Sequence, residues 1–191
     1  MGGLGQNDSR RGEALRAALA ADHDAQRGGG RSRAERFPPA GGKARDCNIA
    51  QMVNVLHSLL LTEEDKCIRT STYHAFDLMK AHRGNLAVRV AQKDTEALGL
   101  SVSASRKDRE LTLTFVNPKT DAEMSVNCSL GGATAAEAKA RVLHHEDLNA
   151  CNTFQEPNRI VPRELDVRAG GAAVQLSLPA LSIATVTVLL A

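Results

Sequence analysis

Aromatic side chains are scarce in this sequence, which has no tryptophan, one tyrosine and four phenylalanines in 191 residues. Proteins that bind single-stranded nucleic acid or sugars by stacking use aromatic faces, so the scarcity argues against a stacking platform. The apolar fraction of 42% and the charged fraction of 24% are those of an ordinary soluble domain. Neither a wholly disordered chain nor a membrane protein is therefore indicated.

Long apolar runs and paired cysteine motifs are also missing. No stretch approaches the roughly 20 continuous apolar residues of a membrane-spanning helix, and the glycine-rich start does not resemble a secretory signal. The four cysteines have no CxxC spacing: Cys47, Cys67, Cys128 and Cys151. We therefore expect reduced thiols in a cytoplasmic protein without a cofactor, with a Cys128–Cys151 bridge as the alternative.

The first 45 residues differ in composition from the rest of the chain. They hold nine of the fifteen glycines, and such a composition cannot bury a core. Residues 1–46 carry nine Lys and Arg against six Asp and Glu, whereas 47–191 carry fifteen against sixteen. We expect 1–45 to be a disordered tail, with a basic nucleic-acid-binding arm as the alternative. The nearly neutral remainder gives no reason to attract nucleic acid or a membrane.

Limited proteolysis tests the expected disorder of the N-terminal segment. We expect rapid cleavage confined to residues 1–40, because too few apolar residues offset the entropy of ordering them. Mass spectrometry of the fragments locates the cuts. Protection of 1–40 equal to that of the C-terminal half would contradict the prediction.

Two helices are predicted after this segment. Apolar residues at helical spacing form one stripe over 46–61, with Asp46 as a plausible N-cap and Glu63-Glu64-Asp65 at the solvated end. His57 falls on the polar side of this stripe. A second, shorter helix is predicted over Thr72 to Ala81, where aromatic and charged residues stand three or four apart.

From residue 84 onward the apolar period shifts to two, which is typical of strands. Strands are predicted around 98–104, 111–115, 124–130, 140–148, 165–169, 174–178 and 183–190, separated by turn residues. Seven or eight short strands without intervening helices indicate an antiparallel β-sandwich over 84–191. Its predicted core contains Leu111, Leu113, Phe115, Val126, Leu176 and Val186.

Four ordered blocks of sequence resemble the α-L-arabinofuranosidases of glycoside hydrolase family 51. They read NIAQMVNVL followed by LLT at 48–62, TYHAFDL at 72–78, LTFVNP at 113–118 and LPALSIATV at 178–186. Together they span about three quarters of the chain, and their order and spacing fit the family. Cys47, Ser71 and Met79 depart from the residues common there.

The resemblance implies a (β/α)8 barrel carrying the active site, followed by a jelly-roll-like sandwich. Asp46 to Leu61 would then be the last barrel helix, so that 46–83 is a barrel remnant and the whole chain is mainly β. The family's substrate-contacting glutamine maps onto Gln51, for which a solvent-facing or helix-capping role is the alternative. Residues 1–42 do not resemble the preceding barrel, which favours a truncated or frame-disrupted product.

The family's catalytic glutamates have no counterpart in this sequence. A retaining glycosidase uses two carboxylates about 5 Å apart; in the family one follows an asparagine and the other lies in an Asp-Glu-Trp segment. The chain has no Asn-Glu dipeptide, no Asp-Glu dipeptide and no tryptophan. We therefore expect no catalytic residue here.

Histidine clusters offer no replacement for the missing carboxylates. Adjacent His144 and His145 on a strand would point to opposite faces, so they would not form a metal site with Cys151. His74 is expected to pack or hydrogen-bond between barrel and sandwich rather than to activate a nucleophile.

Two functions remain on the sequence alone. The first is the C-terminal part of an α-L-arabinofuranosidase, inactive by itself, whose parent hydrolyses terminal arabinofuranosyl residues of oligosaccharides in L-arabinose metabolism. The resemblance allows a homo-oligomer. The alternative is a stand-alone β-sandwich that binds carbohydrate or protein without chemistry.

Overall fold

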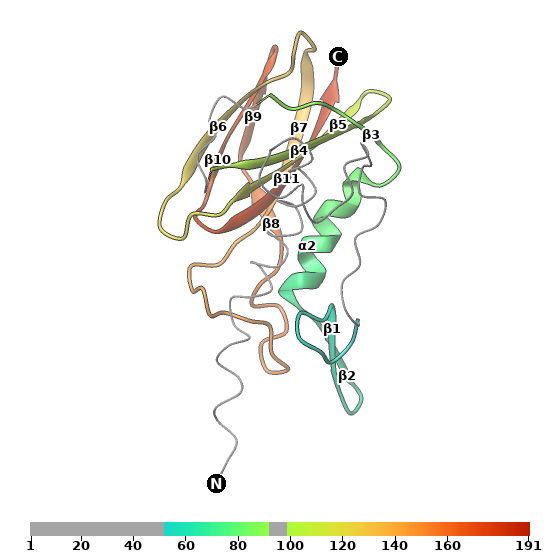
Figure 1. Cartoon of the computed structure of the whole chain (residues 1–191), viewed down its shortest axis with the longest axis vertical. Helices are drawn as coiled ribbons and strands as arrows, with labels where there is room; N and C mark the ends of the chain where they lie inside the picture. The colour runs from blue at the N-terminus through green and yellow to red at the C-terminus, as the bar shows by residue number, and fades with distance from the viewer. Residues whose placement is uncertain (1–51, 92–98) are drawn as a thin grey trace, which may run out of the picture.

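The computed structural model describes residues 52–91 and 99–191. A β-sandwich forms one end of this part of the chain, a β-hairpin projects from the other end, and helix α2 lies between them along one side of the sandwich (Figure 1). The hairpin consists of β1 (Leu60–Glu63) and β2 (Lys66–Arg69). The helix α2 (Ser71–Met79) continues into the 3-10 turn η1 (Lys80–His82).

The sandwich contains a six-stranded and a three-stranded sheet, and every strand pairing in both is antiparallel. The larger sheet has the order β3-β4-β5-β11-β7-β8. Its strands are β3 (Leu86–Ala87), β4 (Ser101–Lys107), β5 (Glu110–Asn117), β7 (Ala135–Leu143), β8 (Arg163–Leu165) and β11 (Ser182–Leu190). The smaller has the order β6-β10-β9, with β6 (Met124–Ser129), β9 (Val167–Gly170) and β10 (Ala173–Leu178).

The main core lies between the two sheets. Side chains on β5 and β11 pack there against side chains on β6 and β10, and all six predicted core residues are buried: Leu111, Leu113, Phe115, Val126, Leu176 and Val186. The predicted antiparallel sandwich is therefore confirmed. Alternation along each strand places one set of side chains inside and the other outside.

A second apolar cluster fixes α2 on the outer face of the larger sheet. Ala75 and Leu78 of the helix pack against Val116, Leu143 and Ile183 of β5, β7 and β11. The predicted helix over 72–81 is thus confirmed, and its buried face explains why so short a helix is ordered.

The helix predicted over 46–61 is wrong from residue 52 onward, and 46–51 lie outside the described residues. Val53 forms a parallel bridge with Leu60, while Asn54 and His57 have φ of 56° and 59°. Those positive φ angles break the helical hydrogen-bond pattern, and asparagine tolerates them better than most residues. Asn54 also bonds to Thr62, donating from Nδ2 to the carbonyl at 3.1 Å and accepting from the backbone N–H at 2.7 Å.

The predicted strand over 140–148 is displaced. The structure has β7 at Ala135–Leu143, so His144 and His145 lie just beyond the strand rather than on it. The first half of β7 is rich in alanine, which gives little contrast between inner and outer positions. The alternation that marks a strand in sequence is therefore weak there.

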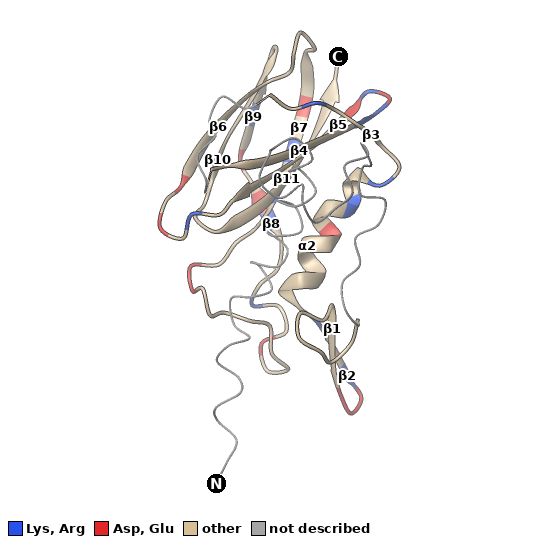
Figure 2. Cartoon of the chain, viewed as in Figure 1, with Lys and Arg blue, Asp and Glu red and all other residues tan. Residues whose placement is uncertain are grey.

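Opposite charges are spread over the sandwich, its loops and the hairpin rather than gathered by sign (Figure 2). Within 52–91 and 99–191, no helix has the length and apolar content needed to cross a bilayer.

Candidate functional site

The candidate site begins at the segment that follows Gln51. Gln51 itself lies outside the described residues, so its contacts are not described. The next residue, Met52, accepts hydrogen bonds through its carbonyl from the backbone N–H groups of Leu59 and Leu60, both at 3.0 Å. The chain leaving Gln51 is therefore held against the start of hairpin β1–β2.

Thr70 connects this segment to α2. Its hydroxyl donates to the carbonyl of Ser58 at 2.7 Å and accepts the backbone N–H of Tyr73 at 3.3 Å as the helix N-cap. Its backbone N–H donates to the carbonyl of Leu59 at 3.0 Å. One residue thus caps the helix and fixes the loop in front of it.

Asn152 anchors the long connection between β7 and β8 to the same place. Its side-chain amide donates to the carbonyls of Arg69 at 2.9 Å and Ile160 at 3.0 Å, and its oxygen accepts the Ile160 N–H at 2.7 Å. Sequence reasoning missed this buried asparagine, because nothing in its neighbours marks it as a link to a segment 83 residues earlier.

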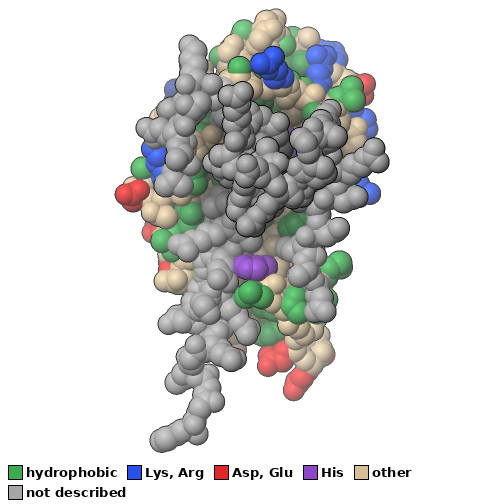
Figure 3. All heavy atoms as spheres, viewed as in Figure 1, with side chains coloured by type: hydrophobic (Ala, Val, Ile, Leu, Met, Phe, Trp, Pro, Cys, Tyr) green, Lys and Arg blue, Asp and Glu red, His purple; other side chains and the backbone are tan. Residues whose placement is uncertain are grey.

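Exposed apolar side chains lie over this end of the molecule. Met52 and Leu56 in the loop and Phe76 on the outer side of α2 are all more than 40% exposed. Figure 3 shows hydrophobic side chains over α2 and the hairpin. This surface has the character of a face that packs against another part of a protein.

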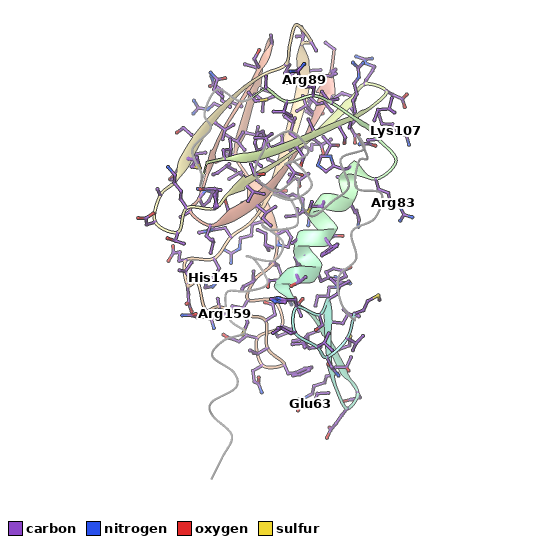
Figure 4. The ribbon with its side chains drawn as sticks, in the orientation of Figure 1. Glu63, Arg83, Arg89, Lys107, His145 and Arg159 are labelled. Carbon is purple, nitrogen blue, oxygen red and sulfur yellow. The ribbon has the colours of Figure 1, made fainter. Side chains whose placement is uncertain are left out.

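The acidic residues Glu63 and Glu64 lie at the end of β1 and in the turn that follows it. Glu63 lies at the far end of the hairpin, remote from the sandwich (Figure 4). Glu64 has a φ of 52° and belongs to the turn between β1 and β2, so these residues end a strand rather than the predicted helix.

Asp77 on α2 is likewise unsuited to donate a proton. Lys80 bonds to its carboxylate at 2.6 Å and Arg141 lies at 3.8 Å, so the pKa of Asp77 is lowered, chiefly by the Lys80 hydrogen bond. A general acid in a glycosidase needs a raised pKa. Asp77 therefore acts as an ionised partner of cations.

His144, His145 and Cys151 lie in or near the connection between β7 and β8. Within the described part of the chain, no group of three or more His, Cys, Asp and Glu side chains is placed to hold an ion. His145 accepts the backbone N–H of Asp147, and the Asp147 carboxylate pairs with Arg159 at 3.4 Å; Figure 4 shows His145 and Arg159 in the β7–β8 connection. Cys67, Cys128 and Cys151 are free thiols, so the Cys128–Cys151 bridge is absent.

His74 is buried on the α2 face that meets the sandwich. Its Nε2 atom has no hydrogen-bond partner. Burial lowers its pKa, and the nearby cations of Arg69 and Arg141 lower it further. A neutral imidazole packed in this way agrees with the expected packing role.

His82 joins η1 to the larger sheet through a chain of hydroxyl groups. Its Nε2 lies 2.7 Å from the Thr114 hydroxyl, which lies 3.2 Å from the Thr185 hydroxyl. Thr185 donates its single hydrogen to the carbonyl of Leu78 at 3.3 Å. Thr114 must then donate to Thr185, so it accepts from His82, and Nε2 carries the ring hydrogen.

The contacts of the other ring nitrogen, Nδ1, show which nitrogen of His82 carries the hydrogen. Nδ1 lies 2.7 Å from the Ser105 hydroxyl, and Ser105 accepts a hydrogen bond from the Asn85 amide at 3.1 Å. Ser105 therefore donates to Nδ1, and the ring is neutral. Protonation of Nδ1 would leave the buried Ser105 hydroxyl without an acceptor, and burial itself lowers the pKa of His82.

Acid should weaken the attachment of η1 to the sandwich. Because the folded-state pKa of His82 lies below the unfolded value near 6.5, its contribution is fully present above about pH 6.5 and is lost as pH falls through the folded pKa. We expect the free energy of unfolding, measured with urea, to fall between pH 7 and pH 5. One proton contributes at most about 1.4 kcal/mol per pH unit.

Substitutions test whether His82, rather than another histidine, causes this pH dependence of the free energy of unfolding. His82→Asn should lower the free energy of unfolding at pH 7 and make it depend less on pH. His145→Asn, in the connection between β7 and β8, should leave that pH dependence unchanged. In both variants His74 still contributes part of the pH dependence of the free energy of unfolding. An unchanged slope in His82→Asn would contradict the assignment.

The fold and the site together define a class: an antiparallel β-sandwich preceded by an ordered linking helix. The family model for the α-L-arabinofuranosidase C-terminal domain matches residues 45–182. The chain belongs to this family, as the sequence blocks indicated.

Named relatives agree with the family assignment. The chain is 29% identical over 148 residues to an intracellular exo-α-L-arabinofuranosidase of Bacteroides ovatus, an alignment covering 72% of this chain and 29% of that protein. It is 25% identical over 158 residues to an intracellular exo-α-(1→5)-L-arabinofuranosidase of Bifidobacterium longum, covering 73% and 28%.

A solved structure shows the same fold. The family 51 arabinofuranosidase of Xanthomonas axonopodis pv. citri superposes with a TM-score of 0.71 at 27% identity, covering 91% of this chain and 35% of that one. The chain thus spans about a third or less of each of these relatives. They correspond to it in their C-terminal part.

Proposed function

We propose that this chain serves as the C-terminal part of an α-L-arabinofuranosidase and has no hydrolytic activity by itself. The match of residues 45–182 to the family's C-terminal domain carries the proposal. The parent activity is the removal of terminal α-L-arabinofuranosyl residues from oligosaccharides in the cytoplasm, for use in L-arabinose metabolism. The names of the two bacterial relatives support the substrate and the location.

The absence of turnover rests on chemistry. Hydrolysis with retention needs a nucleophile and a proton donor across the glycosidic bond, and the sequence has neither glutamate motif. Gln51 contributes a hydrogen bond to the sugar and no proton transfer. Without the two carboxylates this residue cannot turn substrate over.

We propose that residues 46–83 connect the catalytic barrel of the parent enzyme to the sandwich, with α2 as the connecting helix. The apolar side chains of Met52, Leu56 and Phe76 would be covered there. A homo-oligomer built through the parent enzyme remains part of this proposal.

A chimera tests the proposed role and the part of Gln51 in it. Residues 45–191, which include β11, replace the matching C-terminal segment of the Bacteroides ovatus enzyme, and kcat/KM is measured on an aryl α-L-arabinofuranoside. We expect an active chimera, because the transplanted segment would pair with a barrel of its own family. Gln51→Ala should then lower kcat/KM roughly three- to tenfold, the cost of one lost hydrogen bond.

Gln175→Ala is the matched control, because Gln175 is exposed on β10 of the sandwich. It should leave kcat/KM unchanged. A folded chimera without activity would instead favour a stand-alone binding sandwich, and equal effects of the two variants would remove Gln51 from the substrate site.

A further inference from the structure

A pocket of about 200 Å³ lies between α2 and the outer face of the larger sheet. Asp77 and Lys80 line it from the helix side, Lys139 and Arg141 from β7, and Thr185 and Thr187 from β11. The strand register places Thr185 beside Arg141 and Thr187 beside Lys139. Six polar side chains from four elements, α2, η1, β7 and β11, thus line one space.

The pocket carries an excess of positive charge. Lys80, Lys139 and Arg141 contribute three cations, and Asp77 contributes the one carboxylate of its lining. Arg141 lies 3.8 Å from Asp77, which is too long for a hydrogen bond. Its guanidinium fork is therefore available to a planar carboxylate, the group that it matches best.

Lys139, which also lines the pocket, has an exposed carboxylate partner. It pairs with Glu137 at 3.0 Å, and both side chains are more than half exposed. Such surface pairs contribute little to stability. A ligand anion can replace Glu137 at small cost.

Unused hydroxyl groups accompany these charges. The side-chain hydroxyl of Thr187 has no hydrogen-bond partner among the described residues, and its cross-strand neighbour Thr112 has a buried hydroxyl without a partner. Thr185, by contrast, is already engaged with Leu78. Of the two unpartnered hydroxyls, that of Thr187 lines the pocket and can donate and accept a hydrogen bond there.

Asp77 distinguishes among anions. Its carboxylate remains ionised beside Lys80, so it would repel the oxygens of a compact inorganic anion. A sugar ring with a carboxylate offers hydroxyl donors to Asp77 and a carboxylate to Arg141 and Lys139. A cavity of about 150 Å³ holds a benzene ring, so about 200 Å³ accommodates one substituted six-membered ring.

We propose that this pocket binds a uronic acid unit, that is, a sugar ring bearing a carboxylate. The carboxylate pairs with Arg141 and Lys139, and the ring hydroxyls bond to Asp77 and Thr187. The site would bind an acidic carbohydrate on the sandwich and would take no part in the hydrolysis carried out by the parent enzyme. Binding is measured on this chain without catalysis, so its outcome is independent of the proposed enzyme function.

An NMR titration of the full chain with D-glucuronate tests the proposal. We expect saturable shifts of backbone amides in β7 and β11 around Arg141 and Thr187, and no saturation with D-glucose. Sulfate should not saturate the same amides. Arg141→Gln should weaken binding at least tenfold, because a hydrogen bond between charged groups is lost.

Two further variants keep the test decisive if Arg141→Gln loosens α2. Lys139→Gln removes a cation that holds no element in place, and it should weaken binding several-fold. Glu137→Gln removes the competing carboxylate and should strengthen it. Arg168→Gln, on β9 of the smaller sheet, should leave binding unchanged.

Three results would overturn the proposal. The first is the absence of saturable shifts with glucuronate. The second is equal binding of sulfate, which would define a simple anion site. The third is unchanged affinity in both Arg141→Gln and Lys139→Gln.

Discussion

Replacing Phe115 with alanine should lower the free energy of unfolding by about 3–5 kcal/mol. Phe115 is 1% exposed and lies on β5 in the core between the two sheets. Its neighbours on β4 and β11 are Val102 and Ala184. Removing the ring loses its transfer free energy and leaves a cavity that close-packed strands cannot fill.

Phe76 provides the matched control, because it is 41% exposed on the outer side of α2. Phe76→Ala should cost about 1 kcal/mol or less in urea unfolding of the same chain. A loss well under 1 kcal/mol for Phe115→Ala, or equal losses for both variants, would show that the alternation of β5 has been assigned to the wrong face.

The strands were predictable because their alternation has a direct physical cause. In β5, Leu111, Leu113 and Phe115 point into the core between the sheets, as the period of two predicts. Turn residues marked the ends of these strands. At Gly171, a φ of 57° serves the tight connection from β9 to β10, a conformation that glycine adopts without strain.

The helix predicted over 46–61 is wrong over 52–61 because helical spacing of apolar residues does not require a helix. Val53, Leu56 and Leu60 fit the helical period, yet Val53 instead bridges Leu60 across a loop. A periodic stripe specifies a helix only when it is buried on one face. Leu56 is exposed here, so that condition is not met among the described residues.

The polar links around α2 could not be read from the sequence. His82, Thr114 and Thr185 are separated by 32 and 71 residues along the chain, and none belongs to a recognisable motif. Only the sheet register and the position of η1 bring them together. The basic pocket has the same origin, since Arg141 and Thr185 become neighbours through β7–β11 pairing.

The family was predicted from specific sequence blocks, whereas the strands were predicted from the alternation of apolar residues. It depended on ordered blocks such as NIAQMVNVL and TYHAFDL, and the match over 45–182 confirms it. The same blocks point to Gln51 as a contact for substrate. No property of glutamine predicts that role, so it stands on the resemblance and on the chimera that tests it.

The central claim is that this chain has the family's C-terminal fold without its catalytic groups. Three carboxylates of the described residues are engaged or remote: Asp77 pairs with Lys80, Asp147 pairs with Arg159, and Glu63 lies at the far end of the hairpin. A hydrogen bond from Gln51 cannot replace a nucleophile and a proton donor. Turnover is therefore not expected.

The measurement that tests this claim most directly is hydrolysis of an aryl α-L-arabinofuranoside by the purified 191-residue chain. The preparation must be free of host glycosidases, and the Bacteroides ovatus enzyme serves as the positive control. We expect release of the aryl group at the rate of the buffer blank. Turnover that disappears when a glutamate within residues 47–191 is replaced would contradict it and reveal a catalytic site in this chain.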